Sequence, residues 1–89
     1  MDVDAKRLGR NIKGLRQNRG ISQEALANAA KLKLSNLAKL EGGFNSNPTL
    51  STLAAIARVL TNGSIDRLLR WNIYAQFVWL ITISEQNVK

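Results

Sequence analysis

The chain is short, rich in apolar residues and strongly basic. It has 89 residues, of which 45% are hydrophobic, and a formal net charge of +7 at pH 7. This length fits one small domain, and the apolar share is too high for a disordered chain. The absence of cysteine and histidine excludes disulfides, thiolate metal sites and imidazole groups. The charge favours a polyanionic partner, nucleic acid before an acidic membrane surface, although a basic protein without such a partner is the alternative.

Neither membrane insertion nor catalysis is predicted. The N-terminal MDVDAKRLGR lacks the apolar core of a signal peptide, and the longest apolar run, Phe77 to Ile83, is too short to span a bilayer. We therefore expect a cytoplasmic protein with no membrane partner. The chain has six carboxylates without a paired-acid pattern, and it has no phosphate-binding glycine motif. No catalytic residue, metal or cofactor is expected.

The first predicted helix runs from Asp4 to Arg19. Its apolar residues recur every three or four positions and form one stripe, whereas its cations lie off that stripe. Asp4 lies at the start, where the helix dipole favours anions, and Gly20 is a good C-terminal stop. The stripe consists of Ala5, Leu8, Ile12 and Leu15, and the cations are Lys6, Arg7, Arg10, Lys13, Arg16 and Arg19.

The stretch from Gln23 to Leu40 predicts two short helices joined by a tight turn. Apolar residues spaced three or four apart give each helix one inward face. Ser22 is the expected N-cap of the first of these helices. The second is expected to run from about Lys33 to Glu41 and to be presented outward. The apolar positions are Leu26, Ala30, Leu32, Leu37 and Leu40.

Two more helices are predicted after a turn-rich connector at 42–48. One runs from about Leu50 to Leu60 with Thr49 as its cap, and Ser64 caps a fifth, short helix. Five helices with short connectors imply a compact all-α domain. The predicted inward residues are Leu50, Leu53, Ile56, Ala57 and Leu60 in the fourth helix and Ile65, Leu68 and Leu69 in the fifth.

The order and spacing of these segments resemble the Cro/C1-type (lambda-repressor-like, XRE family) helix-turn-helix DNA-binding domains. The matching stretches are LGRNIKGLRQNRGISQEALANAA, LAKLEGG, NPTLSTLAAIARVL and SIDRLL, between Leu8 and Leu69. The resemblance implies a five-helix domain at 4–70 that binds double-stranded DNA. It also implies a transcriptional regulator, expected to be a dimeric repressor that reads a palindromic operator through the helix at about 33–41.

The resemblance assigns roles to individual residues. The positions that contact bases are Lys33, Leu34, Ser35 and Lys39, with side chains able to bond guanine or other base edges or to touch a thymine methyl group. Arg16 and Glu41 match an ion pair between the first and third helices. The positions that contact DNA phosphates are Arg10, Arg16, Ser22, Gln23, Asn36, Gly43, Asn45 and Ser46.

Three features depart from the family pattern. Lys31 stands where a glycine usually makes a left-handed turn, so either Lys31 takes the strained conformation or the turn has another shape. Lys33 stands where a Ser or Thr cap is usual, and the connector at 42–48 has no Lys or Arg. These departures leave a protein-binding adaptor as an alternative function, and a DNA-binding antitoxin paired with a toxin is another.

The segment at 71–89 lies outside the resemblance and is an apolar extension. It holds the Trp and Tyr residues of the chain and one of its Phe residues. Its spacing fits a helix, a strand, or a helix followed by a strand. We expect this segment to form a homodimer interface, with packing on its own domain as the alternative. The predicted interface residues are Trp71, Tyr74, Phe77, Val78, Trp79 and Ile81.

Overall fold

The described part of the chain is helical. The computed structural model describes residues 4–45 and 47–70, and within them it has five helices and no strand. The all-α, five-helix prediction is therefore confirmed for this part, in which no helix is long and apolar enough to cross a bilayer. The predicted extension at 71–89 lies outside the described residues. The helices are α1 (Ala5–Asn18), α2 (Gln23–Ala30), α3 (Leu34–Glu41), α4 (Leu50–Leu60) and α5 (Ile65–Arg70).

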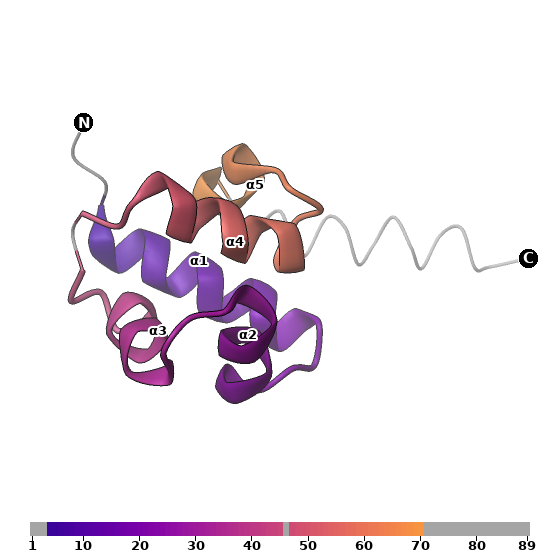
Figure 1. The fold of residues 1–89 in the computed structure, drawn as a ribbon. Coiled ribbons are helices and arrows are strands. Elements are labelled where there is room, and N and C mark those ends of the chain that lie inside the picture. The colour runs from indigo at the N-terminus through magenta and orange to yellow at the C-terminus, as the bar shows by residue number, and fades with distance from the viewer. Residues whose placement is uncertain (1–3, 46, 71–89) are drawn as a thin grey trace, which may run out of the picture.

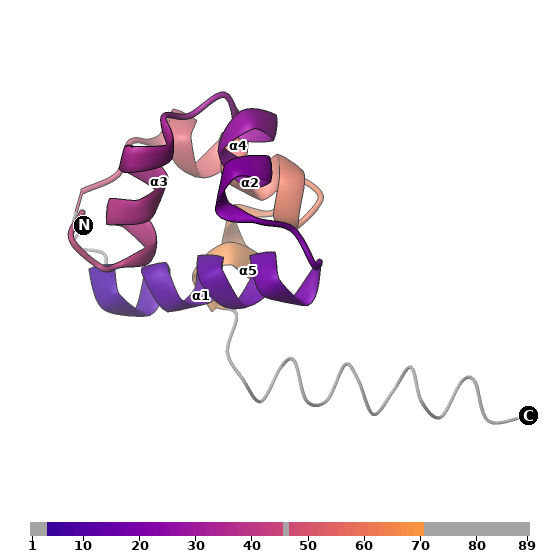
Figure 2. The ribbon, with the colours of Figure 1, turned by 90° about the horizontal axis from the view of Figure 1, so that it is seen from below.

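Helix α1 is the element around which the others are arranged. It packs against α3, α4 and α5, while α2 packs against α3 and α4. Figure 1 shows α2 and α3 below α1 and α4 and α5 above it. In the view from below, α1 runs along the edge of the domain (Figure 2). The helices α2 and α3, with the turn between them, are the predicted helix-turn-helix.

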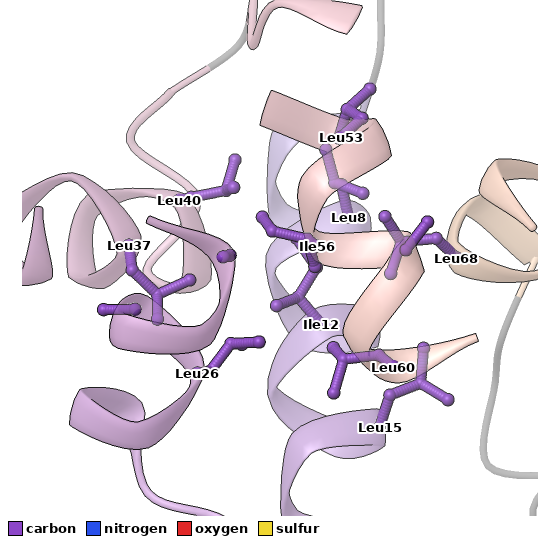
Figure 3. Close-up of a cluster of buried hydrophobic side chains, with 13 residues drawn as sticks. Leu8, Ile12, Leu15, Leu26, Leu37, Leu40, Leu53, Ile56, Leu60 and Leu68 are labelled. Atoms are coloured by element: carbon purple, nitrogen blue, oxygen red, sulfur yellow. The ribbon is translucent and has the colours of Figure 1, made fainter. Parts of the chain in front are cut away.

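A single hydrophobic core joins all five helices. Leu8 and Ile12 of α1 are completely buried, and they meet side chains from the other helices in Figure 3. Each such side chain stabilises the fold by roughly 1.5–3 kcal/mol. The core therefore fixes how the outer faces of the helices are oriented. The buried residues from α2 to α5 are Leu26, Ala27, Ala30, Leu37, Leu40, Leu53, Ile56, Ala57, Leu60 and Leu68.

Side-chain caps set most helix starts at the predicted positions. In each case a side-chain oxygen accepts a hydrogen bond from the backbone N–H three residues further on, which satisfies a group that the helix leaves unpaired. Lys33, before α3, makes no such bond. The capping residues are Asp4 for α1, Ser22 for α2, Thr49 for α4 and Ser64 for α5.

One residue predicted for the core lies on the surface. Leu50 is 71% exposed, so its place in the buried stripe of α4 is wrong. Leu50 is the first residue of α4, and the Cα–Cβ bonds of a helix tilt toward its N-terminus. The first side chain therefore projects past the end of the helix instead of onto the core. The remaining predicted stripe of α4 is buried.

Candidate nucleic-acid interface

The turn between α2 and α3 has left-handed geometry. Lys31, at the C-terminal end of α2, has φ 57° and ψ 43°, a conformation that costs a residue with a side chain roughly 1–2 kcal/mol. The N–H of Lys31 donates to the carbonyl of Asn28 at 3.2 Å, and that of Leu32 donates to Ala27 at 2.8 Å. Of the two shapes that the sequence leaves open, the structure has the left-handed turn, with lysine at the glycine position.

A buried polar network joins α1, the start of α2 and the end of α3. Arg16 Nε and Nη2 donate to Glu41 Oε2 and Oε1 at 2.8 and 3.0 Å, and these side chains are 11% and 2% exposed. Gln23 Nε2 donates to the same Oε1 at 3.0 Å, and Arg16 Nη1 donates to the carbonyl of Ile21 at 2.9 Å. Because a bidentate pair has one preferred geometry, the network fixes the orientation of α3 on α1.

Two glycines allow α3 and the residues after it to lie close to α1. A Cβ atom at Gly9 would lie 2.5 Å from the carbonyl oxygens of Leu40 and Glu41. At Gly43, which has a φ of +79°, a Cβ atom would lie 3.1 Å from Cα of Lys6. Gly9 was not among the predicted residues, although a glycine inside a helical pattern is a signal of close packing. Gly43 was predicted to contact a DNA phosphate, and the close approach that the structure shows at Gly43 is to α1.

The outward side of α3 carries two rows of exposed side chains. Leu34 and Ala38 form an apolar row, and Ser35 and Lys39 form a polar row beside it. Residues four apart on a helix are neighbours on one face, which places the members of each row side by side. Lys33 is also exposed, just before the helix. The residues predicted to contact bases are therefore all exposed on α3 or its cap.

A groove of about 260 Å³ lies between α3 and the connector to α4. Asn36 and Lys39 line it from α3, and Asn45 and Asn47 line it from the connector. Amide and ammonium groups can donate hydrogen bonds to phosphate oxygens, and such contacts position a protein on a duplex. The structure thus brings Asn36 and Asn45, two predicted phosphate contacts, together with Lys39, which the resemblance assigns to base contact.

The other predicted phosphate contacts have different surroundings. Arg10 is exposed on α1, and Ser22 is exposed at the start of α2, where its hydroxyl accepts the N–H of Ala25. Gln23 is half-buried and Arg16 buried, both bonded to Glu41. Ser46 lies outside the described residues, as does the predicted dimer interface.

Exposed cations follow one side of α1. Lys6, Arg10 and Lys13 are four and three residues apart, so they share a helix face. The N-terminal end of this row adjoins the end of α3, because Gly43 packs against Lys6. Arg70, by contrast, is paired with Asp66 at 2.8 Å on α5. The row gives the α1–α3 side of the domain a positive potential that attracts polyanions.

A model of the family described as Helix-turn-helix domain matches residues 7–69. The chain belongs to this helix-turn-helix family. With its order of five short helices, it is a DNA-binding domain of the Cro/C1 type.

Among solved structures, the chain is similar to the restriction-modification controller protein C.AhdI from Aeromonas hydrophila. The two are 29% identical over 73% of this chain and 96% of that chain, with a TM-score of 0.68. No curated protein matches the sequence. The family and this similarity place the chain among DNA-binding regulators of transcription.

Proposed function

We propose that this protein is a sequence-specific repressor that binds a palindromic operator as a homodimer, in the cytoplasm. The observation that carries the proposal is the way α3 is fixed. Its last turn is bound to α1 by the Arg16–Glu41 pair, while its outward rows stay exposed. A rigidly oriented helix with polar and apolar groups on its outer side suits the major groove, where hydrogen-bonding groups and methyl groups distinguish the base pairs.

The polar row and Lys33 supply hydrogen bonds to base edges in this proposal. Lys39 and Lys33 can donate to O6 and N7 of guanine, and Ser35 can bond to several edges. Neither Arg nor Gln occurs in α3, and these residues make many of the strong bidentate contacts. The proposed specificity is therefore modest per subunit and is completed by DNA shape and by the second half-site.

The groove and the start of α2 bind phosphates in this proposal. Asn36, Asn45 and Ser46 approach one strand together with the backbone of Gly43, and Ser22 approaches it at the start of α2. Arg10 adds a charge from α1. Gln23 and Arg16 reach phosphates only with N–H groups that Glu41 does not bind, so their main role is to position α3. Such contacts orient the protein on DNA without reading its sequence.

Dimerisation is proposed through the apolar extension. Two linked copies gain affinity because the second half-site is bound at a high effective concentration. Sedimentation of the full chain and of a Phe77→Glu variant tests this. Sedimentation should show a dimer for the full chain and a monomer for Phe77→Glu. Circular dichroism should show that the variant is folded. The interface is misassigned if both sediment alike. The residues assigned to it are Trp71, Tyr74, Phe77, Val78, Trp79 and Ile81.

Selection of duplex DNA from a random pool by the purified full chain tests the function directly. A repressor of this kind should enrich one two-fold symmetric site. Its affinity should fall with salt, with a log–log slope of about −0.9 for each phosphate neutralised. No enrichment and a flat salt response would instead indicate the protein-binding adaptor. An antitoxin would bind DNA and also co-purify with a toxin encoded beside it.

Two substitutions separate reading from positioning. Lys39→Ala should cost ~1–3 kcal/mol on the selected site and much less on random DNA, because a base contact is lost. Arg10→Ala should weaken binding to both by the same factor, because it removes a phosphate contact. Equal losses for Lys39→Ala on the two DNAs would indicate that Lys39 contacts a phosphate and not a base.

A further inference from the structure

Phe44, in the connector after α3, has a fixed backbone and a ring that has no place in the core. Its N–H donates to the carbonyl of Lys39 at 2.9 Å, and the N–H of Gly43 donates to the carbonyl of Leu40 at 3.2 Å. With Gly43 left-handed at φ +79°, these bonds form the Schellman motif that ends many helices. The Phe44 side chain is 84% exposed. The motif therefore holds an aromatic ring in solvent at the end of α3.

The ring of Phe44 lies where a side chain at residue 42 would be. A Cβ atom at Gly42 would meet the ring carbons Cε2 and Cδ2 at 2.8 and 2.9 Å, and Gly42 still has the right-handed φ of −78°. Residue 42 comes three positions after Lys39 and seven after Ser35, and residues with this spacing share a helix face. The ring therefore continues the outward polar row by one turn, at the C-terminal end of α3.

Cations lie on two sides of this ring. Lys39 is exposed on α3, one turn before it. A Cβ atom at Gly43, next to Phe44, would lie 3.1 Å from Cα of Lys6, which begins the exposed cation row of α1. Neither lysine forms an ion pair within the part of the chain that the structure describes. A single apolar ring among such cations suits a polyanion that also has apolar parts.

The position of the ring along α3 indicates which part of a duplex it reaches. From Ser35 to residue 42 the helix rises about 10 Å, at 1.5 Å per residue, and the major groove is about 12 Å wide. Helices of this class contact base edges with their N-terminal residues, so the C-terminal end comes to the wall of the groove. That wall consists of phosphates and deoxyribose. A phosphate needs hydrogen-bond donors, whereas the carbon atoms of deoxyribose suit an apolar ring.

From these observations we propose that Phe44 packs against the deoxyribose of one nucleotide in each half-site. The inference rests on the proposed function, because it requires α3 to enter the major groove. It gives a role to a side chain that the sequence analysis left in a turn-rich connector. Every nucleotide has the same sugar, so the contact strengthens binding without reading the sequence. Unlike a phosphate contact, it releases no counterion and does not depend on salt.

The first test is Phe44→Ala, which should weaken binding about ten-fold on the selected site and on random DNA alike. That factor corresponds to about 1.4 kcal/mol, as expected for a phenylalanine side chain that becomes about half-buried. The log–log slope of affinity against salt should stay unchanged, whereas Arg10→Ala should reduce it by about 0.9. Leu50→Ala is the matched control, because Leu50 is another large apolar residue on the surface, 71% exposed. It should leave affinity unchanged.

The second test modifies the sugar itself. In the selected site each nucleotide is replaced in turn by its arabinonucleotide, which adds one hydroxyl group on carbon 2′, on the same side of the sugar ring as the base. Because an apolar ring leaves a covered hydroxyl group without a hydrogen bond, the unsubstituted chain should lose about ten-fold in affinity at one nucleotide per half-site. Phe44→Ala should lose less than about two-fold there. Leu50→Ala should behave as the unsubstituted chain does.

The outcomes distinguish this inference from the proposed function. If the full chain binds no duplex DNA, the proposed function fails, and the sugar contact fails with it. If the chain selects a site that Phe44→Ala binds equally well, only the sugar contact is overturned. The contact is also overturned if Phe44→Ala loses affinity on the selected site alone, or if the arabinonucleotide affects both proteins equally. Equal unfolding midpoints in urea would show that Phe44→Ala is folded, as expected because the Schellman bonds join backbone atoms only.

Discussion

Buried polar side chains join helix α1 to α3 and to α5, at two junctions of different chemistry. At the α3 junction, Arg16 and Glu41 form a charged pair that Gln23 joins. At the α5 junction, Asn11 is 5% exposed, and its Nδ2 donates to the carbonyls of Leu68 and Leu69 at 3.1 and 3.0 Å. One junction is ionic and joins side chains, and the other is neutral and reaches the backbone.

The difference predicts how much stability is lost when a side chain is removed from each junction. Removing one member of a buried ion pair leaves a charge without a partner, which costs more than the intact pair gains. Removing a neutral amide leaves carbonyls that lose only a hydrogen bond. The ionic junction therefore tolerates little change in the position of α3, the proposed reading helix. The neutral junction orients α5, which has no proposed contact with DNA.

The largest effect is expected for Glu41→Ala. Because this change leaves Arg16 buried without its carboxylate, the free energy of unfolding should fall by about 3 kcal/mol in urea denaturation. Asp66→Ala is the control, since it breaks an ion pair whose side chains are 78% and 68% exposed and should cost less than about 0.5 kcal/mol. In a double-mutant cycle with Arg16→Leu, additive losses would contradict the assigned coupling between Arg16 and Glu41.

The next effect tests how tightly the α3 junction is packed. Gly9→Ala would place a methyl group against the backbone carbonyls of Leu40 and Glu41, and backbone cannot yield as a side chain can. We expect a loss of about 2 kcal/mol, measured in the same way. Lys13→Ala, on the exposed side of α1, should change stability by less than about 0.5 kcal/mol. Equal stability of Gly9→Ala and the unsubstituted chain would mean that α3 can move away from α1.

The neutral junction should be weaker. Asn11→Ala leaves the carbonyls of Leu68 and Leu69 without their donor, at a cost of about 1.5 kcal/mol. Asn28→Ala, at an exposed position of α2, should have almost no effect. Folded Asn11→Ala should bind the selected DNA as the unsubstituted chain does, whereas folded Glu41→Ala should bind it less well. Similar DNA affinities for these two variants would remove the contrast between the junctions.

The smallest effect concerns the turn that leads into α3. Lys31→Gly should raise the free energy of unfolding by about 0.5–1 kcal/mol. Glycine adopts the left-handed conformation at this position without strain. It also raises the conformational entropy of the unfolded chain, which offsets part of the gain in stability. Thermal unfolding at several salt concentrations measures the change. A loss of stability would show that the Lys31 side chain stabilises the turn by more than the strain costs.

Local patterns were sufficient to predict the helices and most of the core. Ser22, Thr49 and Ser64 cap helices at their predicted places, because a cap depends on a side chain and an N–H only three residues apart. The spacing of Leu8 and Ile12 was enough to assign them to the core. The same reasoning failed at Leu50, because the spacing of apolar residues does not show that a side chain in the first position of a helix projects past its end.

The sequence by itself determined the helices and the residues presented on α3, since these follow from spacing within single helices. The short connectors between five helices indicated the fold class, and the resemblance to Cro/C1-type domains identified the helix-turn-helix. Only the tertiary structure decided the conformation of Lys31, the close approach at Gly9 and the bonds of Asn11 to α5. The close approach at Gly9 and the bonds of Asn11 depend on groups that are brought together by packing. Asn11 and Leu68 are distant in the sequence. No local pattern specifies how closely two helices approach each other. Their separation is set by the shared core, which the whole domain has to form at once.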